Sequence, residues 1–320
     1  MSGLATTQGG VVTAAQCRAL GVDDAAVRRL LARGLWTRAR RGVYADVGFV
    51  PQFTPPAGLE SLASGRGVGD PAHHAQCAAL LACLARPAVV SHLSAARLLG
   101  LPLPPGRPDS RACITRRGPA PTNDPLLGDV HVVDYDAADV LEVAGVPVLA
   151  GARLVLDCCD VLAPDSALAV ADAALARELT TPAALKEALR RRYTRLRAAD
   201  LIAERVVERA DPLAENWFES SSRWWLLEAG LPRPRLQVPF ADRRGRSARV
   251  DMLFDRVVGE ADGAGKYDEP GALFAEKQRE DWLRDVHRLE VVRWVPMEMR
   301  SPSGRAEVVA RFVRAAARAS

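Results

Sequence analysis

Apolar residues near the amino terminus recur at helical spacing in two short stretches separated by a glycine. The first stretch runs from Ala14 to Leu20 after Thr13, and the second runs from Asp24 to Ala32 after Asp23. Thr and Asp before a helix accept hydrogen bonds from its free N–H groups, and glycine after a helix tolerates the left-handed backbone. Residues 35–44 are then rich in β-forming side chains and contain a glycine. The pattern therefore predicts two short helices and a hairpin, the order of a winged helix-turn-helix.

The carboxy-terminal part shows a second, longer pattern. A helix is expected after Pro212, with its apolar stripe on Leu213, Trp217, Trp224 and Leu227. Alternating apolar residues predict strands around 235–240, 249–254 and 257–263, followed by a helix at 273–286 and a strand at 289–294. This order, helix–strand–strand–strand–helix–strand, predicts a separate α/β domain.

Residues 51–75 contain four prolines and little periodicity, which is typical of a linker. From residue 76 to 204, short helical and strand patterns mix and predict an α+β middle domain. The expected fold class is therefore a multi-domain α/β protein. Its predicted parts are a DNA-binding head at 1–50, a linker at 51–75, a middle domain at 76–204 and a carboxy-terminal domain at 205–320. In the middle part, the polar residues are interpreted as caps, helix-surface acids or satisfied polar groups, namely His92, Asp157, Asp160 and Asp172.

Composition excludes several classes of protein. Apolar residues make up 48% of the chain and charged residues 26%, which is ordinary for a globular protein. Apolar runs stay well below the ~18 residues of a membrane span, and the first ten residues lack the features of a signal peptide, so a cytoplasmic protein without membrane contact is expected. The six cysteines have no Cys-x-x-Cys spacing, so buried reduced thiols are expected instead of a zinc site.

The net charge of +4 is too small to indicate nucleic-acid binding by itself, but its distribution is informative. Six arginines and no acidic residue lie between Ala25 and Ala45. Positive charge on the second helix and the hairpin suits a helix in the major groove of duplex DNA with a wing on the phosphates. The alternative is a solvated basic face on a protein-binding winged helix. The predicted DNA-binding residues are Arg28, Arg29, Arg33, Arg38, Arg40 and Arg41.

The same region resembles the winged-helix head of AbiEi-type antitoxins. The resemblance rests on the runs GGVVTAAQ (9–16), LGV (20–22), VRRL (27–30) and RGVYA (41–45). Antitoxins of this kind belong to type IV toxin–antitoxin systems and repress their own promoters. The resemblance therefore implies a transcriptional regulator that binds double-stranded DNA, with a cognate toxin or another protein from a neighbouring gene as partner.

Acidic residues in the carboxy-terminal domain fall where strands end. Asp251 lies on one predicted strand, and Glu260 and Asp262 lie on the next. Carboxylates on adjacent strand ends suit Mg²⁺, which takes oxygen ligands and acidifies its bound water for attack on a phosphodiester. Lysine is rare in this chain, with three lysines beside 40 arginines, and two of the three stand at 266 and 277. Lys266 is therefore the candidate for a positive charge near the phosphate.

This segment also resembles the PD-(D/E)XK nuclease fold, in the branch related to very-short-patch-repair (Vsr) endonucleases. The resemblance rests on three stretches: Glu219 to Gln237; Val250-Asp251; and Glu260-Ala261-Asp262-Gly263 with Lys266-Tyr267, Glu276-Lys277, Arg279-Glu280 and Val292-Arg293. It implies a restriction-endonuclease-like domain with Asp251 and Glu260 as metal ligands and Glu219 as the acid of the first helix. Where the family carries a lysine two residues after the second acid, this chain has Asp262. The predicted catalytic residues are Glu219, Asp251, Glu260 and Lys266, and the predicted metal ligands are Asp251, Glu260 and Asp262.

Three interpretations follow from the sequence. The first is an AbiEi-like DNA-binding regulator with a nuclease-like carboxy-terminal domain. The second is a Mg²⁺-dependent DNA endonuclease or nickase that is targeted by its winged helix. The third is a protein-interaction module, in which the basic helix is incidental. For the carboxy-terminal acids, the alternative to a nuclease-like site is that Glu219 and Arg223 form an ordinary surface ion pair.

Overall fold

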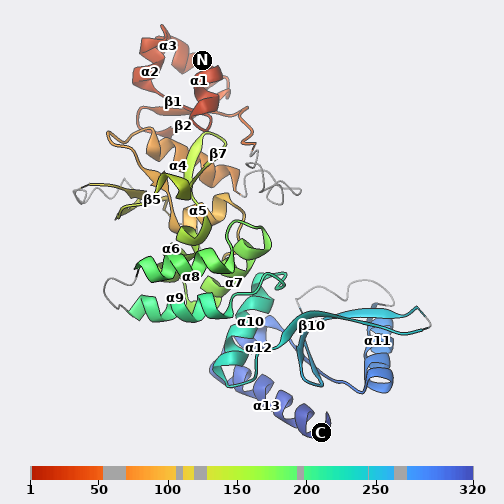
Figure 1. Ribbon diagram of the computed structural model, residues 1–320. Coiled ribbons are helices and arrows are strands. Elements are labelled where there is room, and N and C mark those ends of the chain that lie inside the picture. The colour runs from red at the N-terminus through yellow and green to blue at the C-terminus, as the bar shows by residue number, and fades with distance from the viewer. Residues whose placement is uncertain are drawn as a thin grey trace. The chain divides into compact units, whose positions relative to one another are not determined.

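The computed structural model divides into two compact units, and Figure 1 colours both by position along the chain. The first unit contains residues 1–163 and 177–210, and the second contains residues 164–176 and 211–320. The structure describes residues 2–52, 70–105, 111–118, 128–192, 198–243, 245–262 and 272–319. The first unit contains two sheets and the second contains one.

The first unit begins with a small head that ends near residue 49. Its elements are α1 (Ser2–Thr7), β1 (Val11–Thr13), α2 (Ala14–Ala19), α3 (Asp24–Ala32), β2 (Trp36–Arg40) and β3 (Val43–Asp46). The three strands form an antiparallel sheet in the order β1-β3-β2. The two helices and the hairpin that the sequence predicts are therefore confirmed.

The helices of the head begin and end where the sequence signals lie. The backbone N–H of Gln16 donates to Thr13 Oγ1 at 3.2 Å, while Gln16 Oε1 accepts from the Thr13 N–H at 2.8 Å, which is a complete capping box. Asp23 Oδ1 accepts from the Ala26 N–H at 2.7 Å at the start of α3. Gly21, just after α2, has φ +76°, a conformation that glycine adopts without strain. These local bonds determine where α2 and α3 begin and where the chain turns between them.

The rest of the first unit, called the body here, is a mixed sheet with helices. Its elements are α4 (Pro71–Leu81), β4 (Val89–Val90), α5 (His92–Leu98), β5 (Cys113–Arg116), β6 (Asp129–Val132), a short 3-10 helix (Ala137–Asp139), β7 (Val140–Val143), β8 (Val146–Leu149), α6 (Gly151–Val161), α8 (Pro182–Arg192) and α9 (Ala198–Arg209). The strand order is β6-β5-β4-β8-β7, with β4 parallel to β8 and β5 parallel to β6. Figure 1 shows α8 and α9 running side by side next to α6, and all three helices contact one another.

Helix α4 begins earlier than its apolar pattern predicts. The predicted linker extends to residue 75, whereas in the structure a helix starts at Pro71, with Asp70 Oδ1 accepting from the His73 N–H at 2.9 Å. Proline at the first helical position and aspartate before it are a start signal that the proline-rich surroundings concealed. His73 and His74 are consequently buried helix residues and not part of a connector.

The cysteines largely match the expectation. All six are free thiols, and Cys83 alone is exposed. Burial raises the pKa of Cys77 and of Cys159 to about 12, so both stay protonated and inert at neutral pH. The prediction of buried reduced thiols is confirmed for five cysteines and is wrong for Cys83.

Within the described residues, the second unit contains a four-stranded mixed sheet with helices on both faces. Its elements are α7 (Pro164–Ala176), α10 (Trp217–Glu228), β9 (Arg235–Ala241), β10 (Ser247–Phe254), β11 (Val257–Ala261), α11 (Ala272–His287), β12 (Glu290–Trp294), α12 (Pro296–Met299) and α13 (Pro302–Ala319). The strand order is β12-β11-β10-β9, and only β11 and β12 pair in parallel. Leu226 of α10 and Phe312 of α13 pack on one side with Met252, while Leu283 of α11 packs on the other with Val258. The predicted order of elements from α10 to β12 is confirmed.

Helix α10 buries more of its surface than its apolar pattern predicts. It begins at Trp217, because the side chain of Asn216 accepts hydrogen bonds from the first free N–H groups, and Leu213 before it is 52% exposed. Trp224 of the predicted apolar stripe is buried as expected, but Glu219 and Arg223 are buried too, at 5% and 1% exposed. The interpretation of Glu219 and Arg223 as a surface ion pair is therefore wrong.

The partner of Arg223 is Asp172 of α7, at 2.6 Å between Nη2 and Oδ2. Both side chains are 1% exposed, and Asp172 also accepts from the Asp211 N–H at 2.8 Å. Helix α7 thus joins the second unit through a charge pair that is closed off from water. Asp172 is a satisfied buried residue, one of the three roles that its sequence context allowed.

We expect Asp172→Ala to destabilise the second unit by about 3–5 kcal/mol, because it leaves the guanidinium of Arg223 buried without its carboxylate. The double variant Asp172→Leu with Arg223→Met, which removes both charges, is expected to lose much less stability. Urea denaturation followed by tryptophan fluorescence measures this unit selectively, since five of the six tryptophans lie between residues 217 and 294. As a control, Glu307→Ala breaks an exposed pair with Arg314 and leaves the transition in place. Equal losses for the single and double variants would contradict the role of the buried pair.

Candidate functional site

The six predicted DNA-binding arginines lie on α3 and on the hairpin of the head. Arg28 and Arg29 are exposed on α3, and Arg33 is the residue at which α3 ends. Arg38 and Arg40 lie on β2, and Arg41 lies in the turn that follows. Five of the six side chains are exposed, and Arg40 is half-buried.

The packing of the hairpin explains why its arginines face outward. The rings of Trp36 and Tyr44 stack at 5.9 Å on one side, and Val43 and Ala45 are buried in the head. Strand β2 is an edge strand, and its central residues, including Arg38, are exposed. Gly42, with φ +73°, allows the tight turn that carries Arg41.

These arginines are largely unpaired within the part of the chain that the structure describes. No ion pair with a described residue involves Arg28, Arg29, Arg33, Arg38 or Arg41 there, whereas Arg40 has a partner. Guanidinium groups that are exposed and free of carboxylates can each replace a counterion on a phosphate. A short helix with two exposed arginines beside a basic edge strand has the composition of a DNA-docking surface.

A second group of predicted residues lies in the second unit, around β10 and β11. Residues Met252 and Gly259 are paired across these antiparallel strands, so the same register places Asp251 opposite Glu260. Asp251 Oδ2 accepts from the Ala261 N–H at 3.1 Å. The register of β11 and β12 then places Glu260 beside Arg293. Polar residues thus form a row across the middle of the sheet.

Glu219 reaches this row from the first turn of α10. Its carboxylate accepts from the Glu215 N–H at 2.9 Å, from the Asn216 side chain, and from Gln237 Nε2 at 3.2 Å. Gln237 lies on β9 with φ +50°, an unusual conformation for a residue with a side chain. Both carboxylate oxygens of Glu219 therefore already have protein donors.

The pKa values indicate that three of the acids are close together. Burial, helped by the negative charge of Asp251 and opposed by hydrogen bonds to the carboxylate, raises the pKa of Glu219 to about 7. Burial likewise raises the pKa of Glu260 to about 7, and Asp251 is again the charge that adds to the rise. The structure therefore brings together Glu219, Asp251 and Glu260, and we call these three residues the carboxylate cluster.

The cations of this region come from arginines that sequence analysis did not select. Arg279 Nη2 of α11 lies 3.0 Å from Glu260 Oε1, and Arg293 Nη1 of β12 lies 3.3 Å from Asp262 Oδ2. Lys266, the predicted cation, lies outside the described residues. Arginine is so common in this chain that the residue type gave no signal for Arg279, and only its spacing on the predicted helix could have indicated its position.

The carboxylate cluster does not fit a divalent cation as it stands. Among the residues that the structure describes, no group of three or more His, Cys, Asp and Glu side chains is arranged to hold a metal. Glu260 is already neutralised by Arg279, and Asp262 by Arg293. A metal ion would have to displace at least the guanidinium of Arg279.

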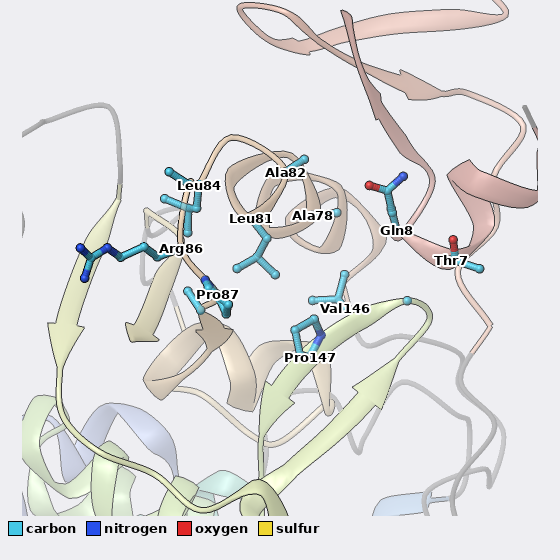
Figure 2. A pocket seen from close by; sticks show the side chains of 13 residues that line it. Thr7, Gln8, Ala78, Leu81, Ala82, Leu84, Arg86, Pro87, Val146 and Pro147 are labelled. Atoms are coloured by element: carbon cyan, nitrogen blue, oxygen red, sulfur yellow. The ribbon is translucent and has the colours of Figure 1, made fainter. Parts of the chain in front are cut away.

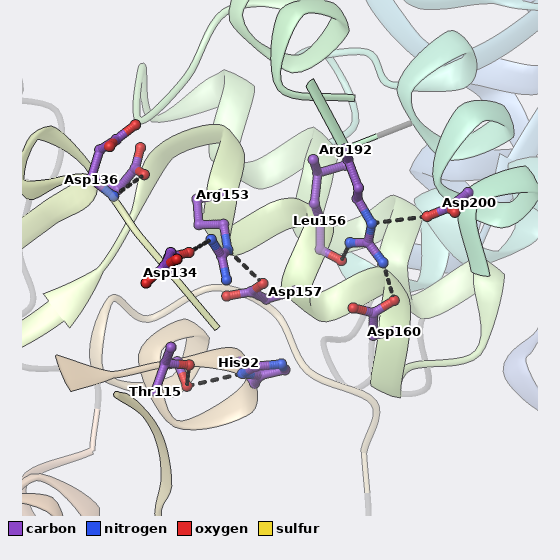
Figure 3. A network of polar contacts seen from close by, with 12 residues as sticks. His92, Thr115, Asp134, Asp136, Arg153, Leu156, Asp157, Asp160, Arg192 and Asp200 are labelled. Atoms are coloured by element: carbon purple, nitrogen blue, oxygen red, sulfur yellow. Dashed lines mark hydrogen bonds and ion pairs between the residues drawn. The ribbon is translucent and has the colours of Figure 1, made fainter. Parts of the chain in front are cut away.

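A third polar network lies in the body of the first unit (Figure 3). Arg153 donates to Asp157 Oδ1 and to the Asp134 carbonyl, both at 2.8 Å, and Arg192 donates to Asp160, Asp200 and the Leu156 carbonyl. These bonds tie α6, α8 and α9 together.

His92 lies close to this network, with its ring stacked on that of His131 at 3.6 Å between centroids. Burial, together with the charge of His131, lowers the pKa of His92 to about 3, so its ring is neutral. Burial also raises the pKa of Asp157 to about 6. Of the roles that the sequence allowed, that of a satisfied polar group fits His92 and Asp160, whereas Asp157 bonds through Oδ1 and its buried Oδ2 has no hydrogen-bond partner among the described residues.

The comparisons with known proteins concern only the head. A search of curated proteins found no match for the chain. No helix within the described residues is long and apolar enough to cross a membrane. The family of transcriptional regulators described as AbiEi antitoxin matches residues 4–45, so this chain is similar to DNA-binding antitoxin regulators over its head.

Proposed function

We propose that the protein is a transcriptional regulator whose head docks on duplex DNA as a winged helix-turn-helix. The observation that carries the proposal is the set of exposed arginines on α3 and the hairpin, five of which have no ion-pair partner among the described residues. In this arrangement α3 enters the major groove, with Arg28 and Arg29 at the base edges. The hairpin with Arg40 and Arg41 follows the phosphates as the wing. The match over residues 4–45 supports this assignment and implies a cognate toxin as a protein partner.

Arginine substitutions on the two parts of this surface should have different effects on DNA binding. Arg28→Ala with Arg29→Ala should cost about 1–3 kcal/mol per lost base contact and change the sequence preference. Arg40→Ala with Arg41→Ala should weaken binding to all sequences alike and reduce the salt slope by about two. Fluorescence anisotropy with duplexes from the region upstream of the gene, at several salt concentrations, measures both effects.

The matched control is Arg190→Ala with Arg191→Ala, which removes the same charge from the exposed end of α8. This control should bind DNA nearly as the wild type does. If all three double variants bind equally well, the head does not dock in the proposed way, and the protein-interaction alternative gains support.

For the second unit we propose a nuclease-like fold that does not cleave DNA in its resting form. The order of its elements and the polar row on its sheet support the likeness to PD-(D/E)XK domains. The ion pairs of Arg279 with Glu260 and of Arg293 with Asp262 support the second part of the proposal, because they neutralise these acids without a metal ion.

A second candidate function is a Mg²⁺-dependent DNA endonuclease or nickase that uses the head for targeting. One observation favours it, namely that Asp251 raises the pKa of both Glu219 and Glu260. Three carboxylates in one place repel one another, and a divalent cation would relieve that repulsion. The two candidates differ in what neutralises the carboxylate cluster.

The raised pKa values predict how stability depends on pH. With folded pKa values near 7 and an ordinary value of 4.5, Glu219 and Glu260 hold more protons in the folded state than in the unfolded state between these limits. Their contribution to the free energy of unfolding therefore falls as pH rises from about 4.5 to 7 and stays low above pH 7. Glu219→Gln and Glu260→Gln should each flatten this slope in urea titrations monitored by tryptophan fluorescence.

The control for the pH experiment is Glu307→Gln, since this exposed carboxylate has a pKa below its usual value through its bond to Arg314. It should leave the slope between pH 4.5 and 7 unchanged. Unchanged slopes in both cluster variants would contradict the raised pKa values.

Metal binding distinguishes the two candidates for the second unit. Because Arg279 neutralises Glu260, we expect about 5 mM Mg²⁺ or Mn²⁺ to leave the melting temperature of the wild type unchanged. Plasmid DNA incubated with the wild type and the metal should remain intact. Arg279→Ala should create a metal-dependent rise in melting temperature, and the added variant Asp251→Ala should abolish that rise. Arg284→Ala, on the same helix but paired with Glu280, is the matched control and should behave like the wild type. A metal-induced shift and nicking by the wild type, both lost in Asp251→Ala, would instead establish the endonuclease.

A further inference from the structure

The exposed face of α3 carries a carboxylate as well as its arginines. Asp24, the first residue of the helix, is exposed, and so are Arg28 and Arg29. Asp24 and Arg28 are four residues apart, so their side chains lie on the same face of α3, separated by one turn. Within the described part of the chain, no hydrogen bond or ion pair involves the Asp24 side chain, although this spacing would allow one with Arg28. The carboxylate of Asp24 can therefore accept hydrogen bonds from a group outside the chain.

The contact between the head and the body leaves this face of α3 exposed. Figure 2 shows Thr7 and Gln8 of the head beside α4 and the β7–β8 turn, around a cavity of about 410 Å³. A Cβ atom on Gly145 in that turn would lie 2.6 Å from the Gly9 nitrogen, so the head and the turn meet backbone to backbone. Helix α4 also contacts the three strands of the head. The body thus contacts the sheet of the head and the end of α1, while Asp24 stays exposed.

The start of α3 is capped without Asp24. The N-cap residue is Asp23, whose Oδ1 accepts from the Ala26 N–H at 2.7 Å. A second carboxylate in the first turn adds a modest stabilisation through the helix dipole, and Asp23 already provides a negative charge there. Helix capping therefore explains Asp23 and gives Asp24 only a minor structural role.

A carboxylate on a DNA-docking surface weakens general binding. The phosphates of any duplex repel it, which opposes the attraction that the arginines of α3 provide. In the major groove, however, a carboxylate has a favourable partner, because the N4 amino group of cytosine donates hydrogen bonds there. Thymine presents O4 and guanine presents O6 and N7, all of which are acceptors that repel a carboxylate. A lower affinity for DNA in general and a preference for cytosine are therefore expected together.

The place of Asp24 on the helix suits contact with a base edge. The N-terminal residues of a recognition helix contact the bases in helix-turn-helix complexes. Arg28, one turn further along, has guanine O6 and N7 as its best partners in the groove. Four residues of an α-helix span about 6 Å, and neighbouring base pairs are about 3.4 Å apart. The two contacts therefore fall on base pairs that are about one or two steps apart.

We propose that Asp24 is a specificity-determining residue that selects a cytosine in the major groove, within two base-pair steps of a guanine bound by Arg28. Asp24 accepts a hydrogen bond from the cytosine N4 amino group and rejects thymine and guanine at the same position. The proposal rests on the proposed function of the head, because it requires α3 to lie in the major groove.

The experiment compares base preferences of the full chain and its variants. Selection from a library of randomised duplexes identifies the sequence that the wild type prefers, and fluorescence anisotropy then measures duplexes with single base-pair changes. The wild type should select a cytosine near a guanine, and replacing that C·G pair by T·A should weaken binding by at least about fivefold. Asp24→Ala should bind both duplexes about equally, and it should bind random-sequence DNA more tightly than the wild type does. The preference for guanine should remain in Asp24→Ala and disappear in Arg28→Ala.

Two further variants serve as controls. Asp24→Asn keeps the size of the side chain, and its amide both donates and accepts, so it should no longer discriminate against thymine. Glu142→Gln removes an exposed carboxylate from β7 of the body and should keep the full cytosine preference. Because Asp23 still caps α3, the melting temperatures of both Asp24 variants should stay within about 2 °C of the wild type.

The outcomes separate this proposal from the proposed function of the head. If both Asp24 variants keep the cytosine preference, or if the wild type selects no cytosine near a guanine, the proposal is overturned and Asp24 acts only on the helix dipole. If the wild type binds no duplex, or if the arginine variants of α3 bind as the wild type does, the proposed function of the head is what fails.

Discussion

The ion pair between Arg223 and Asp172 is the interaction on which the second unit depends. Taking two charges out of water costs several kcal/mol per ion, and only a close pair with further hydrogen bonds repays that cost. The 2.6 Å contact and the Asp211 N–H supply those bonds. Because its partner lies on α7, Arg223 fixes the buried face of α10 and draws into the unit a segment that is separated from it in sequence by α8 and α9.

The same constraint governs the carboxylate cluster. Glu219 and Glu260 are as deeply buried as a core side chain, so each needs a proton, a donor or a cation. Glu219 has backbone and amide donors, and Glu260 has the guanidinium of Arg279. The negative charge of Asp251 contributes to the raised pKa of both Glu219 and Glu260. The guanidinium of Arg279 and a divalent cation would therefore compete for the carboxylate of Glu260.

The sequence predicted those features that local chemistry determines. Caps at Thr13 and Asp23, glycine at position 21 and the alternation along β10 and β11 each act within a few residues, and the elements they predict are present. The features that it did not predict depend on contacts between distant segments. Nothing near Arg223 indicates that Asp172 is its partner, so the sequence predicts a solvent-exposed Arg223 although the residue is buried. Arg279 was missed for the same reason, since its contact with Glu260 spans the sheet from α11.

The arginines of the second unit and those of the head differ in whether a carboxylate lies beside them. Arginine is the commonest charged residue, and most arginines of the second unit are neutralised by a carboxylate within ion-pair distance, as Arg293, Arg311 and Arg318 are. Such pairs orient helices and strands, and they leave little net field. The head has the opposite arrangement, because five of the six arginines between Ala25 and Ala45 are exposed and no acidic residue lies in that stretch. A folded protein gains no stability from like charges gathered on one face, so their position is better explained by an external anion. The regular spacing of phosphates along duplex DNA provides that anion at the scale of one short helix and one hairpin.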